Sequence, residues 1–423
     1  MRVPSTQLRY VNSVQAALQR YDEKFQSINH KIWSAPELAY HEHKAHDHIC
    51  ELFDDLSSEG YSVQRHAYGL PTAFQISYSH GNNNKSNGRI VAFNAEYDAL
   101  PGIGHACGHN LIATSSIAAF IATCEALKSS APADLSYEVR LLGTPAEESG
   151  GGKIRLLENG AYKDVDACLM LHPTPISPTR PEVLSLATPP DGGFLANDKV
   201  RVTFTGKPAH AAAAPWEGVN ALDAVVAAYV NISLLRQQIL PTQRIHGIIA
   251  HGGDRANIIP GSASVHYSIR SPAMATLKPL TERVVKCFEA AAVATGCKVE
   301  FEWGVSYYDV KRNNPLCASY VSAMRTMDHN VLLTVPPEPE QNGGASTDMG
   351  NVSYAVPGFH GIFMIPAQGG NHTPAFTEGA GSVEAYERGI KCAAGIAVVA
   401  CRLLEEEGFA REVRVDFEGR QRI

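Results

Sequence analysis

Hydrophobic positions follow two different periods along the first part of the chain. Apolar residues recur with helical spacing over 7–28 and 36–56, and shorter apolar runs at 72–78 and 89–94 are typical of strands. The polar run 81–88, rich in Asn and bounded by glycine, predicts an exposed hairpin loop between those two strands.

The alternation of helix and strand continues beyond this loop. The pattern predicts helices at 109–127 and 153–157 and strands at 137–142 and 167–171. Strands that alternate with helices indicate an α/β domain whose sheet is mostly parallel and covered on both faces. Ligands of such sheets bind beyond the carboxyl ends of the strands.

A different order of elements follows a segment rich in Pro and Gly at 173–199. The sequence predicts strand, helix, two strands, helix and strand, at 200–205, 219–235, 244–250, 263–270, 274–294 and 298–302. This order is a split βαβ unit, an α+β arrangement of the ferredoxin-like type. Because the α/β pattern resumes with a strand at 360–365 and a helix at 383–404, we expect an inserted domain at 195–310 within a domain formed by 1–194 and 311–423.

Composition narrows the possible partners and compartment. The 423 residues are 44% hydrophobic and 19% charged, with a net charge of -7 and no Lys/Arg block, which argues against nucleic acid. No run of about 18 apolar residues is present, so no membrane partner is expected. The first 15 residues lack the apolar core of a secretory signal, and nine scattered cysteines favour a reducing, cytoplasmic location.

The segment His-Ala-Cys-Gly-His-Asn at 105–110 places a thiol and two imidazoles at the expected start of a helix. A thiolate there is stabilised by the helix N-terminus, which favours its metal-binding form. For Cys107 alone, a buried inert thiol is the simpler interpretation. The adjacent His105 and His109 favour metal ligation, with His105 in a supporting position.

Other metal-type residues follow three separate strands. Asp98, the adjacent pair Glu147 and Glu148, and His172 each come directly after a predicted strand, and His372 lies in a glycine-rich turn. Adjacent carboxylates in a tight turn point apart, so one can bind metal while the other moves protons. Asp98 is expected to orient an imidazole. The set predicts a site for two divalent ions, which together can activate water and polarise a carbonyl.

At these residues the sequence resembles metallopeptidase family M20, subfamily D, which contains aminoacylases and amidohydrolases, and within it a dipeptidase-like branch. The resemblance runs along nearly the whole chain. It rests on the motifs at 36–38 (PEL), 98–101 (DALP), 105–109 (HACGH), 145–148 (PAEE), 206–210 (GKPAH), 257–260 (NIIP) and 346–348 (STD), and on His372.

The resemblance implies a role for each of these positions. It implies that the metal ligands are Cys107, His109, Glu148, His172 and His372 and that Glu147 is the general base. It also implies that the inserted domain is a lid that forms a homodimer, with His210 polarising the substrate carbonyl, often across the dimer interface. Asn257 and Arg270 would hold a substrate carboxylate. From the residues alone, His210 is an ordinary turn histidine and Arg270 a member of a surface ion pair.

We therefore expect a metal-dependent amidohydrolase that cleaves a small N-acyl amino acid or dipeptide. A thiolate ligand suits Zn best, with Mn or Co as alternatives. Two other functions stay open: the same site used to form an amide bond, and a scaffold of the same fold without turnover. The helix with histidines at 41, 43, 46 and 48 is not counted among the metal ligands. The spacing from Glu42 to His46 resembles a metal-binding helix face, but a solvated polar face is the expected structure there.

Overall fold

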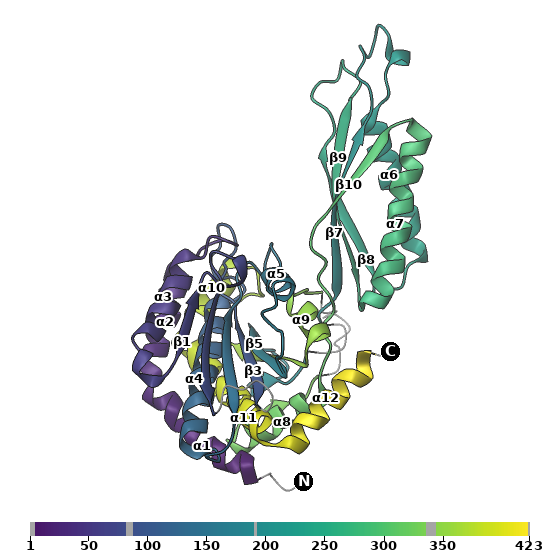
Figure 1. Cartoon of the computed structure of the whole chain (residues 1–423). Coiled ribbons are helices and arrows are strands. Elements are labelled where there is room, and N and C mark those ends of the chain that lie inside the picture. Colours follow the sequence, from purple (N-terminus) through teal and green to yellow (C-terminus); the bar gives the residue numbers. More distant parts are fainter. Residues whose placement is uncertain (1–4, 82–87, 190–192, 336–343, 422–423) are drawn as a thin grey trace. The chain divides into compact units, whose positions relative to one another are not determined.

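The computed structural model describes residues 5–81, 88–189, 193–335 and 344–421. The chain forms two compact units (Figure 1). The catalytic unit, named for the site described below, contains 1–191, 310–342 and 351–423. The lid unit contains 192–309 and also 343–350, a short segment that the sequence pattern places with the C-terminal part.

An eight-stranded sheet forms the centre of the catalytic unit, in the order β1-β2-β4-β3-β5-β12-β6-β11. The central strands β4, β3, β5 and β12 are parallel, whereas β1, β2 and β4 pair antiparallel at one side and β6 pairs antiparallel with β12. The sheet is therefore mixed, with a parallel centre. The strands are β1 (Ser62–Arg65), β2 (Phe74–His80), β3 (Arg89–Ala95), β4 (Tyr137–Gly143), β5 (Ala167–Pro175), β6 (Ser185–Leu186), β11 (Val331–Leu332) and β12 (Gly358–Ile365).

The predicted hairpin between β2 and β3 is wrong. Strand β4 lies between them, antiparallel to β2 and parallel to β3. The connection at 82–87 lies outside the described residues. The polar run in the sequence correctly predicts a break between the two strands. It does not show which strand each of them pairs with.

Two long apolar helices lie together on the sheet. Helix α4 (His109–Ser130) contacts β3, β4 and β5, and helix α11 (Val383–Glu405) packs against α4 and β12. Helix α4 is the one described helix long and apolar enough to cross a membrane, and 94% of its most apolar window is buried inside the protein. The catalytic unit's remaining helices of seven or more residues are α1 (Ser5–Arg20), α2 (Asp22–Ser34), α3 (His43–Asp54), α5 (Gly152–Glu158), α8 (Asn314–Thr326), α9 (Met349–Ala355), α10 (Pro374–Ala380) and α12 (Glu407–Gln421).

The N-terminal helices differ from the expectation in a way that matters for the site. The predicted helix at 36–56 begins only at His43, because Leu38 forms a β-bridge with Ala99 and the chain then turns at Tyr40, which adopts φ 62°. The prediction of a solvated polar face on this helix is also wrong in part. The side chains of Glu42 and His46 are buried, and both face the protein interior.

The lid unit has a four-stranded antiparallel sheet in the order β10-β7-β9-β8, with two helices. Its element order is the split βαβ order that the sequence predicts. The elements are β7 (Ala196–Thr205), α6 (Ala221–Leu235), β8 (Arg244–His251), β9 (Ser262–Ser271), α7 (Met274–Thr295) and β10 (Lys298–Trp303).

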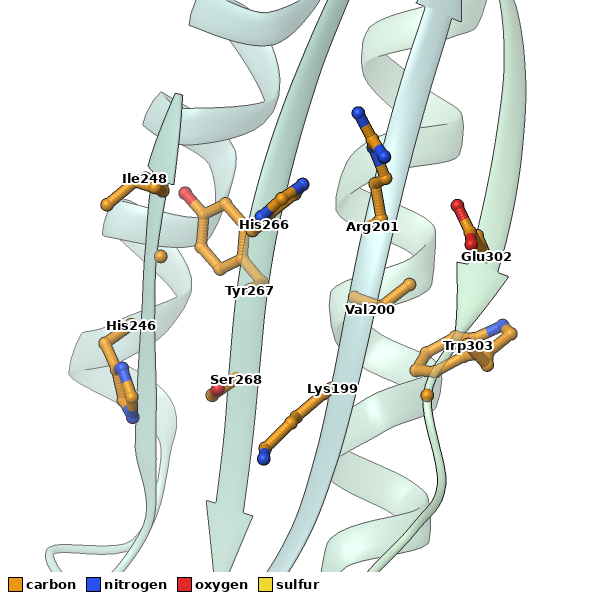
Figure 2. Close-up of a pocket in the computed structure, with 12 residues that line it drawn as sticks. Lys199, Val200, Arg201, His246, Ile248, His266, Tyr267, Ser268, Glu302 and Trp303 are labelled. Atoms are coloured by element: carbon orange, nitrogen blue, oxygen red, sulfur yellow. The ribbon is translucent and has the colours of Figure 1, made fainter. Parts of the chain in front are cut away.

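Part of this sheet forms an open hollow. Figure 2 shows its lining, which includes the basic side chains of Lys199 and Arg201 together with His246 and His266. Glu302 is the acidic side chain of the lining. No group of metal-ligand atoms gathers there among the described residues. The metal ligands that the sequence predicts do not line this hollow.

Candidate dinuclear metal site

The turn before α4 delivers Cys107 and His109 to the carboxyl edge of the sheet. Gly108 adopts φ 76°, and a Cβ atom there would lie 2.5 Å from Pro173 Cγ, so this turn requires glycine. Cys107 Sγ lies 3.4 Å from His172 Nε2. The other nitrogen of that ring, Nδ1, donates to the Pro173 carbonyl at 2.8 Å, which directs Nε2 toward the thiol.

His372 closes the site from the C-terminal part of the chain. Its backbone has φ 68°, and its N–H donates to the Ala106 carbonyl at 2.8 Å. Its Nε2 lies 3.3 Å from Glu148 Oε1. The His372 side chain is 56% exposed and that of Glu148 is 12% exposed, so the cluster opens to solvent beside His372.

The predicted ligands form two overlapping groups. Cys107, His109 and His172 form one, and Cys107, Glu148 and His372 form the other, with the ligand atoms of each group within 4.8 Å of one another. Cys107 belongs to both groups, so its thiolate is placed to bridge two ions. The mixture of thiolate, imidazole and carboxylate suits a borderline-soft divalent ion such as Zn²⁺.

The protonation of the cluster also fits cation binding. Burial would raise the pKa of the Cys107 thiol, but His172 and hydrogen bonds from the surrounding imidazoles lower it to about 6. Hydrogen bonds to Cys107 and Glu148 raise the pKa of His372 to about 10. Protons on the imidazoles thus neutralise the buried negative charges of Cys107 and Glu148. A bound cation could take over this role. His109 Nε2 is buried without a hydrogen-bond partner among the described residues.

Asp98 organises this cluster without belonging to either group. Its Oδ1 accepts the Nδ1 proton of His109 at 3.0 Å, and its Oδ2 accepts the backbone N–H of Glu148 at 3.0 Å. The hydrogen bond between Asp98 and His109 keeps the proton on Nδ1, so Nε2 of His109 is available to bind a metal. His105 instead contacts the Ile32 carbonyl through Nε2 at 3.0 Å, and burial lowers its pKa to about 4, so it is a neutral contact to α2.

The two adjacent glutamates do not simply point apart. Glu147 Oε2 lies 3.9 Å from His109 Nε2, and Glu148 Oε1 lies 3.8 Å from the same atom. What distinguishes them is that only Glu148 belongs to the group with Cys107 and His372. The backbone turn preceding them is tight, since Ala146 adopts φ 59°.

Sequence reasoning missed Glu42, which supports this turn. Its Oε1 accepts the backbone N–H groups of Tyr40 and Ala146, both at 2.9 Å, and its Oε2 accepts the Thr72 hydroxyl at 2.8 Å. Burial, with a contribution from the Asp98 charge, raises the pKa of Glu42 to about 7. No local signal reveals this role, because the contact joins residues more than 100 positions apart.

The raised pKa predicts a pH-dependent stability. The folded protein holds the Glu42 proton more tightly than the unfolded chain, so wild type should lose stability relative to Glu42→Gln as pH rises from 4.5 to about 7. The shift corresponds to a relative loss on the order of 3 kcal/mol. Urea unfolding of both metal-free proteins between about pH 5 and 8 measures it. Parallel stability profiles would contradict the prediction.

The three remaining predicted residues lie in the lid unit. His210 bridges to Ile258, and the Ala211 N–H donates to the Asn257 carbonyl at 3.1 Å, so His210 and Asn257 are neighbours. The N–H groups of Ala212 and Ala213 donate to His210 Nδ1 at 3.2 and 3.1 Å. The exposed Nε2 of this turn histidine therefore carries the proton in the neutral ring.

Asn257 comes before the start of β9 at Ser262, whereas Arg270 lies near the end of this strand. At about 3.3 Å per residue, the strand separates them by about 25 Å, so within one chain they do not hold the same carboxylate. Arg270 donates to the Gly344 carbonyl at 2.7 Å and to Ser346 Oγ at 3.2 Å, in place of the surface ion pair considered for it.

Comparison with known proteins identifies the family. The model of peptidase family M20/M25/M40 matches residues 92–398. The chain is 42% identical to the Xaa-Arg dipeptidase of Mus musculus over 95% of this chain and 91% of the relative. It is 40% identical to the Xaa-Arg dipeptidase of Homo sapiens over 94% of this chain and 89% of the relative. It is also 32% identical to one of the subunits of p-aminobenzoyl-glutamate hydrolase from Escherichia coli, over 68% of this chain and 58% of the relative.

Solved structures agree with the fold. A dinuclear metal binding peptidase of the M20 family from Bacillus subtilis superposes with a TM-score of 0.66 at 20% identity, covering 92% of this chain and 99% of that one. A putative aminohydrolase from methicillin-resistant Staphylococcus aureus gives a TM-score of 0.71 at 18% identity, with 93% and 99% coverage.

The chain belongs to the M20/M25/M40 peptidase family, and it is a metal-dependent hydrolase of peptide or amide bonds. Its two-unit fold is the fold of these dimetal peptidases. Amide-bond formation and a scaffold without turnover are not favoured by these relatives, which are named for hydrolysis.

Proposed function

We propose that this enzyme is a dipeptidase with two divalent ions, Zn²⁺ first among them, that cleaves dipeptides ending in Arg. The proposed two-ion site rests mainly on one observation, namely that Cys107 belongs to both ligand groups. The substrate class is supported by the 42% identity to an Xaa-Arg dipeptidase along nearly the whole chain. N-acyl amino acids are the second class of substrate.

The proposed mechanism uses buried residues of the catalytic unit. When bound, the two ions would acidify a water molecule and polarise the substrate carbonyl. Glu147, whose side chain is 8% exposed, accepts the proton from the attacking water and returns it to the leaving nitrogen. Asp98 keeps His109 in the tautomer that presents Nε2, and Glu148 is held by its backbone bond to the same carboxylate.

The lid unit supplies the contacts to the substrate. His210 presents an exposed Nε2–H that can donate to the developing oxyanion. Asn257, its neighbour, and Arg270 bind the substrate carboxylate. Asn257 comes before the start of β9 and Arg270 lies near its end, so one copy of the chain cannot place both on the same carboxylate. We therefore propose that two copies bind one substrate, with His210 and Asn257 coming from the second copy.

A screen of Ala-Arg, Ala-Glu and N-acetyl-arginine, each with Zn²⁺, Mn²⁺ or Co²⁺, tests this proposal. We expect kcat/KM for Ala-Arg to exceed that for Ala-Glu by at least about tenfold, which corresponds to about 1.4 kcal/mol of differential transition-state binding. Equal rates for the two dipeptides would remove the arginine specificity. Faster cleavage of N-acetyl-arginine would make the enzyme an aminoacylase.

A homodimer through the lid unit is also part of the proposal. Strand β8 is an edge of the described sheet, and Ile248 and Ile249 on it are exposed. Helix α6 carries an exposed apolar stripe that includes Val230 and Leu234. An apolar edge strand and an apolar helix face in one small unit are typical of an interface between two copies.

Charges placed on the α6 stripe should separate the dimer. In Val230→Asp/Leu234→Asp, each carboxylate would be buried against the partner and close to its own symmetry copy, so dimerisation should weaken by at least about 100-fold. Light scattering after size-exclusion chromatography measures the mass. Val293→Asp is the matched control, since Val293 is a highly exposed residue of α7. A double variant that stays dimeric would contradict the assigned surface.

A further inference from the structure

We infer that Glu96 is an additional ligand of the ion held by Cys107, His109 and His172, and that Lys153 positions its carboxylate. This assignment rests on the proposed metal site and extends its ligand set. Glu96 follows β3, two residues before Asp98, at the same edge of the sheet as the other ligands.

Burial of the Glu96 carboxylate costs free energy unless a cation or a hydrogen-bond donor compensates its charge. Its side chain is 1% exposed, and its Oε2 has no hydrogen-bond partner among the described residues. That oxygen lies 3.5 Å from His109 Nε2, which is also buried without a hydrogen-bond partner. Two buried polar atoms that face each other in this way are the arrangement expected around an ion.

The separation matches shared coordination. Two ligands about 2.1 Å from a tetrahedral ion are about 3.4 Å apart. Glu96, His109 and Glu147 form a group of ligand atoms within 4.8 Å, and Glu96 is nearer than Glu147 to His109 Nε2. If Glu96 coordinates the ion, Glu147 is not needed as a ligand and can carry protons.

Lys153 explains how the carboxylate is held. Its Nζ lies 2.6 Å from Glu96 Oε1, and the lysine side chain is fully buried at α5. The ammonium engages one carboxylate oxygen while the other faces His109. Carboxylates that bind metals are commonly fixed by such a neighbouring donor. A buried pair is poor evidence for stability by itself, because desolvation offsets the attraction.

The test separates a metal ligand from a counterion of Lys153. In Glu96→Gln/Lys153→Met both charges are removed together, so no buried charge is left alone, and Glu96→Asp keeps the charge but shortens the side chain. We expect Zn²⁺ to bind at least about 100-fold more weakly at one site in both variants, beyond the 10- to 100-fold typical of supporting residues. Asp166→Asn is the matched control, because Asp166 accepts the Ile90 N–H at the opposite end of β3.

The visible spectrum of the Co²⁺ protein gives a readout that a structural role would not move. Loss of a carboxylate ligand should change the position and intensity of the absorption bands of one Co²⁺ ion in both variants. An unchanged spectrum, or Zn²⁺ affinity within about threefold of wild type at both sites, would overturn the assignment of Glu96. Wild type that binds no Zn²⁺ would instead overturn the proposed function.

Discussion

Glu147→Gln is expected to abolish turnover while both metal ions stay bound. The amide keeps the size of the side chain but cannot take a proton from water, and removal of a general base typically costs 10²- to 10⁴-fold in rate. We expect a loss of at least about 1,000-fold in kcat with little change in KM, because the substrate contacts assigned to the lid unit are untouched. Steady-state kinetics and metal analysis on the same preparation measure both quantities.

The geometry makes this experiment discriminating. Glu147 Oε2 is 3.9 Å from His109 Nε2, so Glu147 could itself be a metal ligand. If Glu147→Gln loses an ion together with its activity, Glu147 is a ligand and the base must be another group. If it keeps both ions and normal turnover, the assigned base is wrong. Glu138→Gln serves as a control, since Glu138 lies on β4 of the same unit and pairs with Arg140.

The sequence predicts the location of this site better than its internal geometry. The ends of parallel strands meet at one edge, so Asp98, the glutamate pair and His172 can be brought together from the pattern alone. How side chains at these ends face one another depends on turns such as that at Ala146, whose φ of 59° is not expected for this residue type. The shared approach of both glutamates to His109 is therefore not predictable from the sequence.

Long-range pairing explains the other differences. Helical spacing places Glu42 on a solvated face because it shows only neighbours along the chain, whereas the burial of Glu42 results from contacts to Thr72 and Ala146. In contrast, the separation of Asn257 from Arg270 is already implied by the length of the predicted strand at 263–270. Glu96 could likewise be found from the sequence, since it lies two residues before Asp98 after the same strand.

Cys107→Ala is expected to cost both metal ions, which no other single ligand substitution should do. Cys107 belongs to both ligand groups, whereas His172 belongs only to the group with His109, and His372 only to the group with Glu148. Loss of the thiolate also removes the negative charge that its low pKa of about 6 makes available at neutral pH. Activity should fall to background in the alanine variant, because neither water activation nor carbonyl polarisation survives.

Metal analysis of a small set of variants tests the bridging arrangement. After dialysis against a weak chelator, His172→Ala and His372→Ala should each retain about one ion per chain, and Cys107→Ala close to none. Cys124→Ala is the control, since Cys124 is a buried thiol of α4 outside both groups and burial raises its pKa well above the usual value. If Cys107→Ala keeps one ion with normal affinity, the thiolate serves a single ion, and the bridge must be one of the carboxylates that face His109.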